Sequence, residues 1–124
     1  MNIGDVVNKI LVVDDVPVNR LLLDCYLKQV PKVESVSSGE DAVSATKREK
    51  YDLILMDIDL GKGICGQEAT RRIHKSLLNK NTPVVAVTSY PKSSLNMELF
   101  DDYISKPVYR DVLFNKINSL ISKG

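Results

Sequence analysis

Carboxylates follow two short apolar runs in this 124-residue chain. Asp14 and Asp15 come directly after ILVV, whereas Asp57 comes after LILM and precedes Asp59 by two positions. Close carboxylates repel one another unless a cation lies between them, and Mg²⁺ favours one or two carboxylates together with a phosphate oxygen. Because an aspartate beside such a cation can attack phosphorus and form an aspartyl phosphate, the pattern indicates metal-assisted phosphoryl chemistry.

Two further apolar runs end in groups that would complete such a site. The run VVAVT ends at Thr88, and Lys106 follows the run YIS. A lysine can share the negative charge of a transferring phosphoryl group with a metal ion. Each residue alone is most often a turn or cap residue. Their joint occurrence at the same end of every central run is much harder to obtain by accident.

The elements that must position these residues alternate between apolar runs and amphipathic helical patterns. Such alternation predicts a doubly wound α/β fold, with a parallel sheet and helices on both faces. Five strands in one domain favour the flavodoxin-like order 2-1-3-4-5, which brings the acidic strand ends to one crevice. Strands are expected over 10–13, 32–36, 53–56, 83–88 and 102–105, and helices over 17–29, 66–78, 108–121 and from a capping box at 37–40 through residue 50.

Composition and charge narrow the functional classes. The chain is 44% hydrophobic and 27% charged, with a formal net charge of +1, so we expect no direct binding of nucleic acid or a membrane surface. No run approaches the roughly 20 apolar residues of a spanning helix, and the N-terminus lacks a signal-peptide pattern. Cys25 and Cys65 are expected to be free, buried or loop thiols of a cytoplasmic protein. His74 is expected on a solvated helix face.

The combined motifs resemble the receiver domain of two-component response regulators. The similarity rests on four motifs, which are ILVVDD followed by PVNR, LILMD before a glycine-rich loop, VVAVTS, and DDYISKPV. It covers roughly residues 9–121, and we expect one receiver domain over 1–124. The resemblance implies that Asp57 accepts a phosphoryl group from a phosphohistidine on a histidine kinase or a histidine phosphotransfer protein. It also implies that the acids Asp14 and Asp15 hold Mg²⁺ and that the backbone carbonyl of Asp59 completes the metal site.

Three further roles follow from the same resemblance. Thr88 is expected to bond the phosphoryl group, and Lys106 to pair with it. Tyr103 matches the aromatic residue whose rotamer follows the threonine, so Thr88 and Tyr103 form the expected switch. The Lys106–Pro107 peptide is typically cis in the family. A receiver of this kind catalyses its own phosphorylation and slow dephosphorylation, and we expect no turnover enzyme.

The chain departs from the family pattern in three places. The loop 60–66 is one residue longer and lacks the usual proline, so we expect it to be more mobile. Tyr90, two positions after the threonine, and Asp59 are expected to slow hydrolysis of the phosphorylated form. The segment 92–100 is about one turn short, which predicts a shortened helix of about two turns or an irregular segment. Because this segment offers little ordered surface, we expect a monomer even after activation.

Two other readings remain open. The stretch DIDLG also fits the D-x-D motif of haloacid-dehalogenase-like phosphatases, although their motif order is the reverse and a cap domain would not fit in 124 residues. A receiver-like interaction module that is not phosphorylated is the other alternative, against which the intact set of acids, threonine and lysine argues. PVNR is especially similar to receivers attached to hybrid histidine kinases, whereas the initiating Met favours a stand-alone domain.

Overall fold

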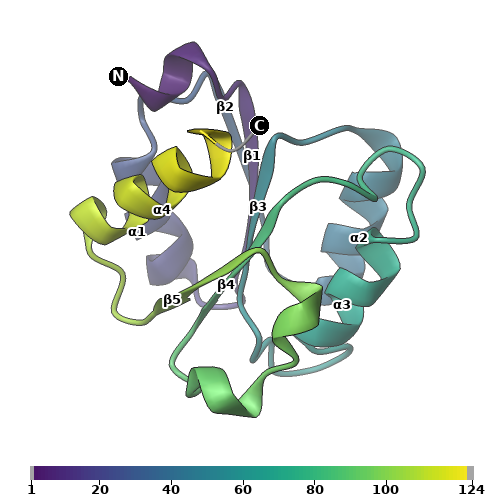
Figure 1. Cartoon of the computed structure of the whole chain (residues 1–124). Coiled ribbons are helices and arrows are strands. Elements are labelled where there is room, and N and C mark those ends of the chain that lie inside the picture. Colours follow the sequence, from purple (N-terminus) through teal and green to yellow (C-terminus); the bar gives the residue numbers. More distant parts are fainter. Residues whose placement is uncertain (1, 123–124) are drawn as a thin grey trace.

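A five-stranded parallel sheet forms the centre of the computed structural model, which describes residues 2–122. The strand order is β2-β1-β3-β4-β5 (Figure 1), so the predicted flavodoxin-like topology is confirmed. The strands are β1 (Lys9–Val13), β2 (Lys32–Val36), β3 (Leu53–Met56), β4 (Val84–Thr88) and β5 (Asp102–Ser105).

Helices cover both faces of the sheet. Helices α1 (Pro17–Tyr26) and α4 (Arg110–Ser122) lie on one face, and α2 (Gly39–Arg48) and α3 (Gly66–Ile73) lie on the other (Figure 1). Successive side chains of a strand point to opposite faces. In β1, Ile10 and Val12 therefore join the core under α1 and α4, whereas Leu11 joins the core under α2 and α3. Burial on both faces explains why the central strands are continuous apolar runs.

Helix α3 ends earlier than the sequence predicts. Its last residue is Ile73 rather than Leu78, and Leu77, which lies beyond this end, is 91% exposed. The buried side chain of Asn79 explains the early end. Its Nδ2 donates to the carbonyls of Thr46 and Glu49, and its Oδ1 accepts from the Tyr51 amide. These hydrogen bonds hold the segment after α3 against the end of α2, in a position that a continued α3 helix would not reach. Helices α1 and α2 also end before their predicted limits.

The connection between β4 and β5 contains two short 3₁₀ turns, η2 (Lys92–Ser94) and η3 (Met97–Leu99), where a shortened helix or an irregular segment was expected. His74 links α3 to this connection, because its Nε2 lies 2.8 Å from the Leu99 carbonyl oxygen. His74 is half-buried, so the prediction that it lies on a solvated face was wrong.

Cys25 and Cys65 are free and both are exposed. Cys25 lies on α1, so it is neither a buried thiol nor a loop thiol.

A further 3₁₀ turn, η1 (Ile3–Asp5), precedes β1 and packs against the end of the sheet where β1 begins. Ile3 and Val7 are buried in the α1 and α4 core. A Cβ atom on Gly4 would lie 1.9 Å from the carbonyl oxygen of Gln29, so this close approach requires glycine. Among residues 2–122, no helix is both long and apolar enough to cross a bilayer.

Candidate functional site

Two buried aspartates lie side by side at the carboxyl ends of β1 and β3. Val13 and Met56 are partners in the sheet register, so the residues that follow them, Asp14 and Asp57, are placed together. Both aspartates are buried, whereas the adjacent Asp15 is exposed. Oxygen atoms of the three carboxylates lie within 4.8 Å of one another. An all-oxygen donor set of this kind suits a hard divalent cation that keeps some of its water ligands.

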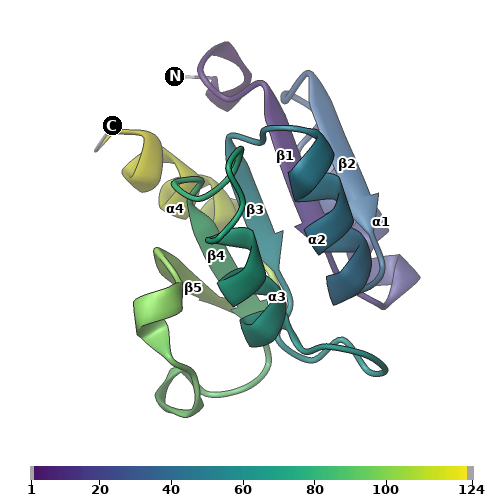
Figure 2. The ribbon, with the colours of Figure 1, turned by 90° about the vertical axis from the view of Figure 1, so that its right-hand side faces the viewer.

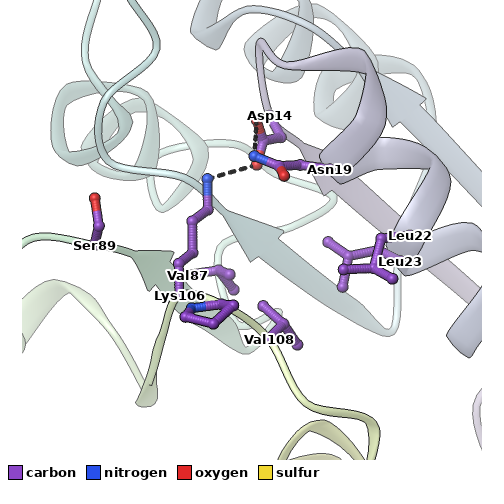
Figure 3. A pocket seen from close by; sticks show the side chains of 9 residues that line it. Asp14, Asn19, Leu22, Leu23, Val87, Ser89, Lys106 and Val108 are labelled. Carbon is purple, nitrogen blue, oxygen red and sulfur yellow. Dashed lines mark hydrogen bonds and ion pairs between the residues drawn. The ribbon is translucent and has the colours of Figure 1, made fainter.

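Lys106 links the two buried carboxylates. Its Nζ lies 2.8 Å from Asp14 Oδ2 and 2.7 Å from Asp57 Oδ2, and Figure 3 shows the lysine side chain extending toward Asp14. The backbone of this lysine is held beside β4, because its amide donates to the Thr88 carbonyl at 3.0 Å. The Lys106–Pro107 peptide that follows is cis. The pocket therefore carries its own cation opposite the acids.

The two partners of this ion pair have shifted pKa values. Burial raises the pKa of Asp57 above its usual value, and the charge of Asp14 acts in the same direction, while Lys106 opposes both. Burial lowers the pKa of Lys106, but its hydrogen bonds to Asp14 and Asp57 outweigh burial and leave that pKa raised. The lysine is thus cationic, and burial disfavours the charged form of the Asp57 carboxyl.

Residues 16–20, which include the PVNR stretch, hold Asp14. The Arg20 Nη1 donates to the Asp14 carbonyl at 2.7 Å, and the Val16 amide donates to Asp14 Oδ1 at 2.9 Å. Asn19 approaches the same carboxylate through its Nδ2 at 3.5 Å. Sequence reasoning noted this stretch only as a resemblance. Its positioning role could not be inferred, because it depends on where the start of α1 turns back onto β1.

Asp59 lies at the edge of the site. Its amide donates to Asp57 Oδ1 at 3.2 Å, and its own Oδ1 accepts from the Gly61 amide at 3.3 Å. Asp59 and Tyr90 line the same surface hollow. Interaction with the Asp59 carboxylate raises the pKa of the Tyr90 phenol, so the two side chains lie close to each other in this hollow.

Thr88 and Tyr103 both contact the backbone of Tyr90. The buried Thr88 hydroxyl accepts from the Tyr90 amide at 3.2 Å. The Tyr103 hydroxyl donates to the Tyr90 carbonyl at 2.6 Å. The two residues predicted to form a switch are therefore joined through one peptide segment at the end of β4.

Glu40 is a site neighbour that sequence reasoning missed. The capping box was expected to pair Ser37 with Glu40, but Ser38 is the N-cap and its hydroxyl accepts from the Asp41 amide. The Glu40 carboxylate instead accepts from the Ile64 amide at 2.9 Å, in the loop that follows Asp57. This hydrogen bond lowers the pKa of Glu40. The sequence carries no local signal for a contact between residues 24 positions apart.

Comparison with known proteins identifies the family. The family model of the response regulator receiver domain matches residues 10–118 of this chain. This chain belongs to the response regulator receiver family. The receiver is 32% identical over 119 residues to protein PilH of Pseudomonas aeruginosa, covering 92% of this chain and 98% of PilH. It is thus a receiver domain of two-component signalling, and the predicted resemblance is confirmed.

Longer sensor proteins and a solved receiver are also similar. The receiver is 36% identical over 108 residues to sensor protein GacS of Pseudomonas syringae pv. syringae, which covers 81% of this chain but 12% of GacS; the chain therefore spans only a small part of such relatives. A solved structure, the receiver domain of sensor histidine kinase PA1611 from Pseudomonas aeruginosa PAO1, has a magnesium ion in its active-site cleft. It aligns with a TM-score of 0.80 and 30% identity over 93% of this chain and 98% of that one.

Proposed function

We propose that this receiver accepts a phosphoryl group on Asp57, from a phosphohistidine on a histidine kinase or a histidine phosphotransfer protein. The observation that carries the proposal is the position of Asp57, which is buried, 2.7 Å from the Lys106 ammonium and beside the carboxylates of Asp14 and Asp15. In the transfer, an Asp57 carboxylate oxygen forms a bond to phosphorus as the phosphorus–nitrogen bond breaks. The imidazole leaves with the bonding electron pair.

The surrounding residues have separate tasks. Asp14, Asp15 and Asp57, with the Asp59 backbone carbonyl, would hold Mg²⁺, and their oxygen donors fit that ion. When bound, the ion neutralises the charge of the acids and of the phosphoryl oxygens. Lys106, already within 2.8 Å of two carboxylates, pairs with a phosphoryl oxygen. Once phosphoryl oxygens are present, the Thr88 hydroxyl donates to one of them, and Tyr103 follows through the Tyr90 segment.

A surface beside the site supports the proposed protein partner. A hollow of about 350 Å³ is lined by the charged residues Asp14 and Lys106 and by apolar side chains that include Leu22 and Val108 (Figure 3). Helix α1, which contributes Leu22 and Leu23 to this lining, also carries the exposed apolar residues Val18 and Leu21, which are 65% and 62% exposed. Exposed apolar side chains grouped beside a polar site are typical of protein interaction surfaces. We propose that the phosphodonor approaches over α1.

The remaining proposals concern the domain as a whole. We propose that residues 1–124 act as a single cytoplasmic receiver domain that binds neither nucleic acid nor membranes directly. The domain stays monomeric and signals by a change of shape. The exposed β4–β5 connection supports the monomer, since its two 3₁₀ turns of three residues each offer little ordered surface to a second copy.

Intact-mass measurement tests the phosphoacceptor. With acetyl phosphate and Mg²⁺, the wild-type mass should rise by one phosphoryl group, and Asp57→Asn should abolish this rise. Asp59→Asn, two positions away, is the matched control and should still be labelled. Full labelling of the Asp57→Asn variant would contradict the assignment, and absence of labelling in the wild type would favour a non-phosphorylated interaction module. Turnover of a generic phosphatase substrate, which we do not expect, would favour a phosphatase.

A further inference from the structure

The first turn of α2 is fastened to the loop that follows the acceptor. Besides the hydrogen bond from the Ile64 amide, the Glu40 carboxylate lies against Gly63, where a Cβ atom would be 2.5 Å from Glu40 Oε2. One residue before Glu40, a Cβ on Gly39 would lie 2.7 Å from Ile64 Cγ1. Figure 2 shows this loop extending past α3 toward the start of α2, at the same end of the sheet. Two consecutive residues of α2 thus contact two consecutive residues of the loop.

The other end of the same loop contacts the acid cluster. Gly61 has a positive φ of 70°, and a Cβ atom there would lie 3.2 Å from Asp15 Oδ2. Asp14 is held by Arg20, Lys106 and the Val16 amide, whereas Asp15 is exposed and lies against Gly61. Asp15 is thus the member of the acid cluster that lies against the loop.

We propose that Glu40 is a positioning residue for the phosphoryl-transfer site. Its carboxylate holds residues 63–64, this anchor sets the path of the loop, and Gly61 then keeps Asp15 beside Asp14 and Asp57. The inference rests on the proposed function, because it assigns Asp15 to the metal-holding cluster. Holding Asp15 in place before a cation arrives reduces the ordering needed on binding.

Asp41 provides a matched control. Glu40 and Asp41 are both exposed acids in the first turn of α2, so both interact favourably with the helix dipole. Their side chains differ in that the Glu40 carboxylate accepts from the loop amide, whereas Asp41 contributes its backbone amide to the Ser38 cap. An effect of Glu40 substitution beyond that of Asp41 substitution thus reports the loop contact.

The experiment compares wild type, Glu40→Ala, Glu40→Gln and Asp41→Ala. Mg²⁺ affinity is measured by isothermal titration calorimetry, and the labelling rate with acetyl phosphate is measured at subsaturating Mg²⁺. Glu40→Ala should weaken Mg²⁺ binding and slow labelling by about fivefold, the effect of losing one ordinary hydrogen bond. Glu40→Gln keeps an amide oxygen that accepts from Ile64 and should recover most of the loss. Asp41→Ala should match wild type in both measurements.

Hydrogen exchange at the Ile64 amide separates positioning from a purely structural role. Faster exchange in Glu40→Ala, together with weaker Mg²⁺ binding that Glu40→Gln restores, would support the proposal. Faster exchange with Mg²⁺ affinity equal to that of Asp41→Ala would overturn it while leaving the phosphoacceptor role intact. If wild type binds Mg²⁺ but is not labelled, the proposed function fails, and the Mg²⁺ titration still decides the role of Glu40.

Discussion

Two connections border Asp57, and they differ in glycine content and in the contacts that hold them. The β3–α3 loop contains Gly61 and Gly63, both at positive φ, yet it is anchored to Glu40 on one side and packs against Asp15 on the other. The β4–β5 connection has no glycine and is tied at separate points, where Tyr103, His74 and Gln67 bond its backbone. Most of its residues are nevertheless exposed, and its 3₁₀ turns are only three residues long. The comparison teaches that glycine content alone does not decide whether a loop is held.

The physical reason lies in the space that a missing side chain leaves. A glycine at positive φ gives a chain freedom when nothing contacts it, but it also lets a neighbouring carboxylate or backbone approach closely. In the β3–α3 loop, the Asp15 carboxylate approaches Gly61 and the Glu40 carboxylate approaches Gly63 in this way. In the β4–β5 connection, Leu95 and Leu99 are only partly buried against the α2 and α3 core, so tertiary packing supports a regular helix weakly.

The largest effect on the free energy of unfolding is expected for a substitution at Gly66, where the β3–α3 loop meets α3. A Cβ atom on Gly66 would lie 2.0 Å from the Asp57 carbonyl oxygen, which is backbone and cannot move aside cheaply. We expect Gly66→Ala to lower the free energy of unfolding by about 3 kcal/mol. Ser94→Ala, in the other connection, should change it by no more than about 0.5 kcal/mol. Urea unfolding measures both, and similar midpoints would remove the contrast between the two connections.

A smaller difference is expected between the two loop glycines. Gly63→Ala and Gly61→Ala share the cost of a left-handed backbone conformation, about 1 kcal/mol. Alanine at 63 should cost about 1 kcal/mol more, since its Cβ would lie 2.5 Å from the Glu40 carboxylate, against 3.2 Å from Asp15 at 61. Denaturation of both variants, repeated with Glu40→Ala, tests the cause. The extra cost should disappear without the carboxylate, and its persistence would show that Glu40 does not crowd the loop.

The hollow between the two connections should influence the lifetime of the phosphorylated form. Tyr90 is 42% exposed and, with Asp59, lines that hollow. We expect Tyr90→Ala to admit water and Asp59→Asn to remove a negative charge from its path. Each change should speed the decay of phospho-Asp57 roughly threefold, under 1 kcal/mol of barrier. Tyr109→Ala, at an exposed residue outside that hollow, is the control. Unchanged decay in both test variants would refute shielding.

The smallest expected effect is on oligomeric state. A specific interface needs about 800 Å² per partner, and the exposed turns between Lys92 and Leu99 offer little ordered surface. Sedimentation velocity should therefore show the same monomer with and without beryllofluoride and Mg²⁺. A dimer that forms on addition of beryllofluoride, and that substitutions within 92–100 abolish, would show that the exposed β4–β5 connection becomes an ordered interface.

Most of the fold could be predicted because the burial of a strand determines which residue types occur along it. Strands buried on both faces are apolar runs, and each strand was placed within one residue of its observed limits. Helix ends were predicted less well. The end of α3 depends on Asn79, whose side chain bonds the backbone at Thr46 and Glu49, and no periodicity within α3 carries that information. His74 was misplaced for the same reason, since its partner Leu99 is 25 positions away.

The sequence by itself determined which chemical groups stand at the strand ends. Asp14, Asp57, Thr88 and Lys106 follow apolar runs, and parallel strands place such residues at one edge of a sheet. Only the tertiary structure decided what holds them: Arg20 on the Asp14 carbonyl, Lys106 between two acids, and Glu40 on the loop that reaches Asp15. A strand pattern repeats every two residues and is readable locally, whereas a contact between distant residues depends on the path of the chain between them.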